Sequence, residues 1–178
     1  SRAEKIREDI RRLRKENEDR IKEIEDEFRK LLEEHERKNK EIEERVRRLV
    51  KRIEDEIRRK NVPKDEVKRI RDDIRRLEKR AKEVHERSKR RLDELRERFK
   101  RLEKRLREIH EEIERELRKR GLTDELAKRV REVSEDVNRR LDKIMKDLRR
   151  VIKELDEESK RLLEEIKRRM EEILEELR

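Results

Sequence analysis

The sequence contains no cysteine, tryptophan, tyrosine or glutamine, and only one glycine, one proline and two phenylalanines among its 178 residues. Without cysteine the chain has no disulfide framework, no thiolate metal site and no cysteine nucleophile. A single glycine excludes the glycine-rich loops that cradle phosphates. No apolar run approaches the roughly 18 residues that a membrane-spanning helix needs, and no signal or transit peptide is visible at the N-terminus. We therefore expect a soluble chain with no membrane partner.

Charged residues make up 64% of the chain and hydrophobic residues 28%. Lysine and arginine (62) exceed aspartate and glutamate (52), which gives a net charge of +10. A nucleic-acid interface usually combines a one-sided basic patch with aromatic side chains that stack on bases. Here acids alternate with bases throughout, and the only aromatic residues besides three histidines are Phe28 and Phe99. The composition therefore predicts a solvated, ion-paired surface and no nucleic-acid partner.

Uncharged residues recur along the first third of the chain with a period of 18 residues and an internal spacing of 4, 3, 4, 4 and 3. The three periods are Ile6, Ile10, Leu13, Asn17, Ile21; Ile24, Phe28, Leu31, His35, Asn39; and Ile42, Val46, Leu49, Ile53, Ile57. Eighteen residues over five turns is 3.6 per turn, the period of a straight α-helix. The later parts of the chain keep this pattern. It predicts helices with an apolar arc of roughly 100–140°, wide enough for contact with two neighbouring helices.

Two short segments interrupt the helical pattern. In the first, Asn61 suits the left-handed residue that ends a helix, and Pro63 suits the first turn of the next helix. In the second, Gly121 follows one helix and Thr123 caps another. We therefore expect helices over about 2–60, 64–119 and 124–178. Because both connections are short, these long, nearly straight helices should form an all-α, antiparallel up-down-up three-helix bundle that is a single domain.

Uncharged polar side chains outside the caps and loops fall on the apolar arcs, where a buried polar group needs a partner. Alignment of the antiparallel helices through their short turns places these residues at two levels. The first level holds His35, Asn39, His85, Ser88 and Ser159, and the second holds Asn17, His110, Ser134 and Asn138. Grouped in this way the side chains can satisfy one another. We expect two buried hydrogen-bond networks that specify helix register and orientation.

The uniform repeat, the charged surfaces, the helix caps and the polar networks in an aliphatic core resemble those of de novo designed, parametrically generated three-helix bundles. The resemblance covers the whole chain and rests on the style of the sequence, not on a catalytic motif. It implies a hyperstable structural scaffold with no enzymatic or other natural activity and no need for a cofactor, a metal or a partner. It further implies a monomer with no native compartment, which would be cytoplasmic on recombinant expression.

Two other functions remain open. Histidines on apolar arcs favour a pH-responsive bundle, because burial disfavours the charged imidazole and makes stability decline as the pH falls. A nearby carboxylate, such as that of Glu103 or Glu158, would reverse this sign. An apolar flank on the third helix favours a module that binds a partner helix or self-associates. The flank consists of Met145, Ile152, Leu163, Met170 and Leu174.

Metal binding and catalysis are not expected. His35 and His85 share a level, but the further ligands there would be asparagine and serine, whereas zinc needs three or four strong ligands. A serine and a histidine could meet across that level. Continuous helices, however, have no free backbone N–H group to form an oxyanion hole.

Overall fold

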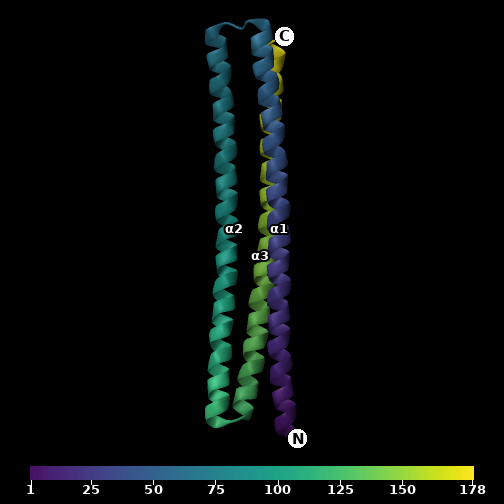
Figure 1. Cartoon of the computed structure of the whole chain (residues 1–178), viewed down its shortest axis with the longest axis vertical. Helices are drawn as coiled ribbons and strands as arrows, with labels where there is room; N and C mark the ends of the chain where they lie inside the picture. The colour runs from purple at the N-terminus through teal and green to yellow at the C-terminus, as the bar shows by residue number, and fades with distance from the viewer. The chain divides into compact units, whose positions relative to one another are not determined.

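The computed structural model describes all residues from Ser1 to Arg178 as three α-helices joined by two short connections (Figure 1). The helices are α1 (Arg2–Lys60), α2 (Lys64–Arg120) and α3 (Asp124–Glu176). No β-strand is present, and the three helices pack against one another, so the predicted all-α three-helix bundle is confirmed. The helix α2 ends one residue later than expected, and α3 ends two residues earlier.

The helix ends are set by the residues that the sequence marks as caps. The backbones of Asn61 and Gly121 have left-handed φ angles of 47° and 71°, the conformation that commonly ends a helix. The N–H of Gly121 donates to the carbonyl of Leu117 at 3.0 Å. At the start of α3 the Thr123 hydroxyl accepts from the N–H of Leu126 at 3.1 Å. These bonds satisfy backbone groups that would otherwise lack partners at the helix ends.

The helices form two compact units, each of which contains one segment of every helix. Unit 1 comprises Ser1–Lys30 and Leu92–Arg150, and unit 2 comprises Leu31–Arg91 and Val151–Arg178. That the whole chain forms a single domain stays a prediction.

Each unit has an aliphatic core contributed by all three helices. In unit 2 the most deeply buried side chains include Ile53, Ile166 and Met170, which are fully shielded from solvent. In unit 1 a core cluster forms around Ile113 and Leu126. No large hydrophobic side chain is exposed, so the apolar arcs are covered, as the hydrophobic effect requires. None of the helices has an apolar segment long enough to cross a bilayer.

Ion pairs on the surface report the alignment of the helices. In unit 1 the guanidinium of Arg2 lies 3.1 Å from Asp124 and that of Arg20 lies 2.6 Å from Asp142. Both pairs join α1 to α3 across the same sequence separation of 122 residues, so these two segments run parallel. Exposed ion pairs of this kind contribute at most about 1 kcal/mol each. The core, not the charged surface, therefore supplies most of the stability.

Candidate functional site

The nine polar residues expected in buried networks differ in how deeply they lie. Five are buried, namely Asn17, His35, Ser88, Ser134 and Ser159. Three are half-buried, namely Asn39, His110 and Asn138. His85 is exposed, so the prediction that it is buried is wrong. His85 shares its helical phase with Val67 and Glu103, which are both only half-buried, because this phase lies at the edge of the apolar arc.

One buried hydrogen bond in unit 1 joins α1 to α3. The hydroxyl of Ser134 donates to Oδ1 of Asn17 at 3.3 Å. The two residues are 3% and 2% exposed, so water competes little for either group. The structure thus brings together two residues that are far apart in sequence and that were expected at one level.

The other two residues expected at this level lie outside that bond. Nε2 of His110 is buried and has no hydrogen-bond partner. Burial lowers the pKa of His110, and the neighbouring guanidinium of Arg14 lowers it further. No hydrogen bond joins Asn138 to the Asn17–Ser134 pair. The structure therefore has a bonded pair in place of the expected four-residue network.

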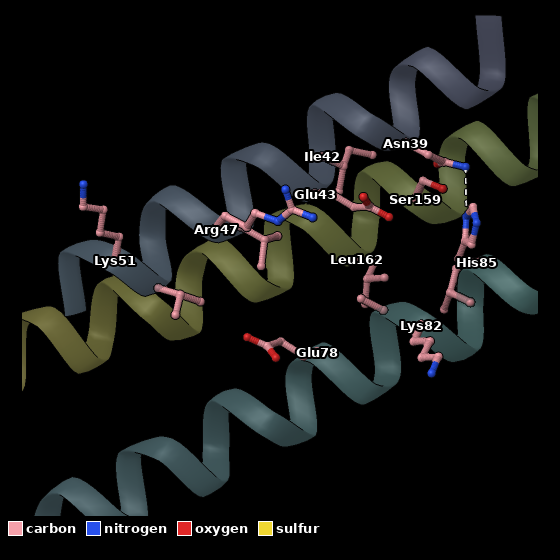
Figure 2. A pocket seen from close by; sticks show the side chains of 14 residues that line it. Asn39, Ile42, Glu43, Arg47, Lys51, Glu78, Lys82, His85, Ser159 and Leu162 are labelled. Atoms are coloured by element: carbon pink, nitrogen blue, oxygen red, sulfur yellow. Dashed lines mark hydrogen bonds between the residues drawn. The ribbon is translucent and has the colours of Figure 1, made fainter. Parts of the chain in front are cut away.

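A chain of polar contacts in unit 2 crosses all three helices. Nδ1 of His35 on α1 lies 3.1 Å from Oδ1 of Asp156 on α3, and its Nε2 lies 3.2 Å from Nδ2 of Asn39. The same amide nitrogen lies 3.4 Å from Nδ1 of His85 on α2 (Figure 2). The other carboxylate oxygen of Asp156 accepts from the ammonium of Lys38 at 3.1 Å.

The direction of each bond in this chain follows from the available donors and acceptors. An ionised Asp156 can only accept, so Nδ1 of His35 carries a hydrogen. The amide nitrogen of Asn39 can only donate, so Nε2 of His35 and Nδ1 of His85 each accept one of its two hydrogens. The hydrogen of His85 lies on Nε2, which leaves that N–H free to donate elsewhere.

Two serines expected in this network make no bond to it. The hydroxyl of Ser88 donates to the carbonyl of Val84 in its own helix at 3.0 Å, a local bond that satisfies the group. Ser159 is buried and has no hydrogen bond to His35, Asn39 or His85. Alignment of the helices places Ser159 at the level of Asn39 and His85, with which it lines one cavity; for Ser88 the level stays a prediction. The alignment alone does not show whether a side chain as short as that of serine reaches a neighbouring helix.

Asp156 is the residue of this site that the sequence reasoning missed. It lies 18 residues after Asn138 and 18 before Leu174, so it occupies a phase that otherwise holds uncharged residues. A carboxylate at such a phase is the signal that could have identified it. The chain has few other charged residues at the apolar phases, because charged residues are concentrated on the opposite face of each helix.

The two carboxylates that the sequence offers as histidine partners face other groups. Glu158 lies 3.6 Å from the guanidinium of Arg87. Glu103, in unit 1, faces Glu25, and burial together with this neighbouring carboxylate raises the pKa of Glu103. The phases of these residues alone could not predict which side chain turns toward an imidazole.

A cavity of about 460 Å³ opens beside Asn39 and His85 in unit 2 (Figure 2). Asn39, His85 and Ser159 lie together at one end of it (Figure 2). Its apolar wall is formed by Ile42, Val46, Val50, Ala81, Val84 and Leu162. The volume falls within the range of roughly 300–1,000 Å³ that is usual for small-molecule sites.

The wall of the cavity differs from the equivalent level of unit 1. In unit 1 the rings of Phe28 and Phe99 pack together with centroids 5.4 Å apart. The equivalent residues in unit 2, 18 positions later in α1 and 18 earlier in α2, are Val46 and Ala81. Both of them line the cavity. At this level of unit 2 smaller side chains therefore stand where unit 1 has two phenyl rings.

Five charged residues surround this cavity, and they differ from most of the surface. They are Glu43, Arg47, Lys51, Glu78 and Lys82. None of the five forms an ion pair, although ion pairs cover much of the remaining surface. The three cations exceed the two anions by one, so the rim carries a small positive charge.

The apolar flank of α3 does not form an open docking stripe. Met145, Ile152 and Met170 are buried, and Leu163 and Leu174 are half-buried. The three buried side chains are therefore not available on the surface. In unit 2 Leu174 packs against the main aliphatic core.

The fold and these contacts define an all-helical protein with polar bonds across its helices and a cavity of small-molecule size in unit 2. No group of three or more histidine, aspartate or glutamate side chains is placed to hold a metal ion. No protein-family model, curated protein or solved structure matches the chain.

Proposed function

We propose that the chain is a designed structural scaffold with no natural biochemical activity, in which polar bonds between helices specify how the helices align. Support for the designed origin comes from the agreement of independent local rules. The 18-residue repeat, the caps at the helix ends and the nearly all-charged exposed faces favour the same fold.

The bond between Asn17 and Ser134 is the observation that carries this proposal. An aliphatic side chain can pack against many different aliphatic neighbours. The repeat by itself therefore allows one helix to slide along another. A shift would separate Asn17 from Ser134 and leave two buried polar groups without partners. Each such group costs roughly 1–3 kcal/mol. The polar bond therefore favours one alignment over its competitors.

Spin labels can test this role, because the chain has no native cysteine. Labels attached to cysteines at the exposed positions Asp19 and Lys143 report the alignment of α1 and α3 in unit 1. We expect a narrow distance distribution in the parent protein. The double substitution Asn17→Leu with Ser134→Ala should broaden it, since the core stays filled while the specific bond is lost.

The matched control is Ser88→Ala. Ser88 is as buried as Ser134, but its hydroxyl bonds only within its own helix. Its removal should leave the label distances unchanged. An equally narrow distribution in the parent, the double variant and the control would refute the alignment role.

A pH-responsive function is the second candidate, and the shared amide of Asn39 favours it. Protonation of His35 or His85 would place an N–H group against the donating Nδ2 of Asn39. Rotation of the amide by half a turn replaces Nδ2 with Oδ1, which can accept from both imidazoles. Protonation of one histidine thereby favours the form of the other histidine that carries a hydrogen on the nitrogen facing Asn39.

Imidazole ¹⁵N chemical shifts test this coupling, because they distinguish the two tautomers and the charged form. We expect the tautomers of His35 and His85 to change together in the parent and independently in Asn39→Ala. The substitution His110→Ala in unit 1 serves as the control and should leave both histidines unaffected. Independent changes of the two imidazoles in the parent protein would exclude the coupling.

A further inference from the structure

We propose that the cavity of unit 2 is a binding site for an aromatic carboxylate with two fused or linked rings. This inference goes beyond the scaffold function and stands independently of it. Three features of the molecule define the ligand: the shape of the apolar wall, the hydrogen-bonding groups at one end, and the charge of the rim.

The shape follows from a comparison within the molecule itself. At the equivalent level of unit 1 the space between α1 and α2 is filled by the rings of Phe28 and Phe99. Val46 and Ala81 leave that space open in unit 2. Cavity walls made of aliphatic side chains can take up aromatic molecules such as benzene. Two aromatic rings are thus the shape that these helix backbones accommodate.

The polar end of the cavity offers hydrogen-bond donors. Nδ1 of His85 accepts from Asn39, so its Nε2–H remains available as a donor. The hydroxyl of Ser159, beside the same end, has no partner among the neighbouring polar side chains (Figure 2). Two donors at the end of an apolar cavity suit a carboxylate, which accepts at both oxygens.

The charge of the rim favours an anion over a neutral ligand. Arg47, Lys51 and Lys82 outnumber Glu43 and Glu78 around the cavity. Because none of these side chains is held in an ion pair, a cation can turn toward a bound carboxylate without breaking an existing contact. The binding free energy gained is that of an exposed ion pair, so it makes only a small contribution to the affinity.

A partner helix fits this site less well than a small molecule. An α-helix with its side chains is about 10–12 Å across and needs a continuous apolar groove, as in helix-in-groove recognition. The opening holds only about 460 Å³, and no large hydrophobic side chain is exposed around it.

Titration with 2-naphthoate tests the site directly. The chain has no tryptophan or tyrosine, so naphthalene fluorescence can be followed without overlap from the protein. We expect saturable binding of one molecule per chain. The neutral analogue 2-naphthol should bind roughly two- to fivefold more weakly, which is the effect of losing an exposed ion pair.

Substitution of Ala81 by Phe should abolish this binding, because the new ring occupies the position that Phe99 has in unit 1. The matched control is Ala3→Phe, which adds the same ring at an exposed position and should leave binding unchanged. If Ala81→Phe does not fold, Val46→Phe fills the cavity from α1. Ligand-induced NMR shifts at the methyl groups of Val46, Val50 and Leu162 locate the site without any substitution.

Three results would overturn the proposal. The first is undiminished binding to a folded Ala81→Phe or Val46→Phe variant. The second is tighter binding of decanoate than of 2-naphthoate, which would show an aliphatic and not an aromatic site. The third is non-saturable binding with no localised NMR shifts at the cavity methyl groups.

Discussion

Unit 1 and unit 2 use the same 18-residue pattern of helical phases, yet they fill equivalent positions differently. In unit 1 Phe28 and Phe99 pack ring against ring. In unit 2 the corresponding Val46 and Ala81 line an open cavity. At this phase the two units therefore differ in how side chains fill the space between α1 and α2.

The polar groups of the two units also differ. In unit 1 both residues of the Asn17–Ser134 bond are buried, and neither is titratable. In unit 2 the polar chain begins at a buried His35 and ends at an exposed His85. A closed, neutral pair suits the specification of alignment, whereas a chain that reaches solvent can respond to protons or to a ligand.

The largest effect expected from this comparison is that of Phe99→Ala. Loss of the ring should open in unit 1 the kind of cavity that unit 2 already has, and lower the free energy of unfolding by about 3–5 kcal/mol. The reverse change, Ala81→Phe, should raise it by about 0.5–2 kcal/mol by filling the existing space. Guanidinium chloride denaturation measures both. Opposite signs are required, and a loss of stability from both substitutions would show that the two positions are not equivalent.

The substitution Asn17→Ala ranks second. It leaves the hydroxyl of Ser134 without its partner on α1 and should cost about 1–3 kcal/mol. The control is Asn138→Ala, because Asn138 is half-buried and takes no part in this bond. Its cost should stay within about 0.5 kcal/mol. Equal losses in the two variants, measured by denaturation, would remove the evidence for a special Asn17 contact.

His110→Leu should stabilise the protein by about 1 kcal/mol at pH 7, because it removes a buried nitrogen that has no partner. The residues at the same phase are Ile74 and Leu92. The pKa of His110 in the fold lies below its ordinary value of 6.5, so the unfolded chain takes up the proton more readily. Stability is therefore full above about pH 6.5 and declines as the pH falls toward the folded pKa.

The corresponding measurement is the free energy of unfolding of the parent and of His110→Leu between pH 8 and pH 5. The advantage of the leucine variant should grow as the pH falls through this range. An advantage that shrinks on acidification would mean that the imidazole gains, not loses, stability from its proton.

The smallest effect is expected for Glu103→Gln, which should raise the free energy of unfolding by roughly a few tenths of a kcal/mol at pH 7. Burial and the carboxylate of Glu25 raise the pKa of Glu103 in the fold. The fold therefore favours the protonated acid, and this contribution is lost as the pH rises through the folded pKa. Thermal melts at pH 7 and at pH 4 should show the gain at the higher pH alone. Glu158→Gln, which loses an ion pair with Arg87, should show no gain at either pH.

Much of the fold was predictable from local rules. Asn61, Gly121 and Thr123 are residues whose backbone or side chain has one preferred role at a helix end, and each has that role in the structure. The apolar phases predict the core because an 18-residue period keeps one face of a straight helix turned inward. Both signals depend on residues close together in the sequence.

The details of the polar site were less predictable, because they depend on the reach and rotation of individual side chains. His85 lies at the edge of its arc and faces water, and Ser88 bonds to its own helix. Asp156 was overlooked among many acidic residues, although it interrupts an uncharged phase. The cavity required the comparison of Phe99 with Ala81 across helices, which becomes visible only when the pairing of the helices is known.

The most direct test of the account is a double-mutant cycle of Asn17→Ala and Ser134→Ala, followed by guanidinium chloride denaturation. If the bond between these residues specifies the alignment of α1 and α3, their coupling free energy should be about 0.5–1.5 kcal/mol, the net value of a protein hydrogen bond. A coupling of about zero would mean that the two side chains act independently, and the claim that polar bonds align the helices would be contradicted.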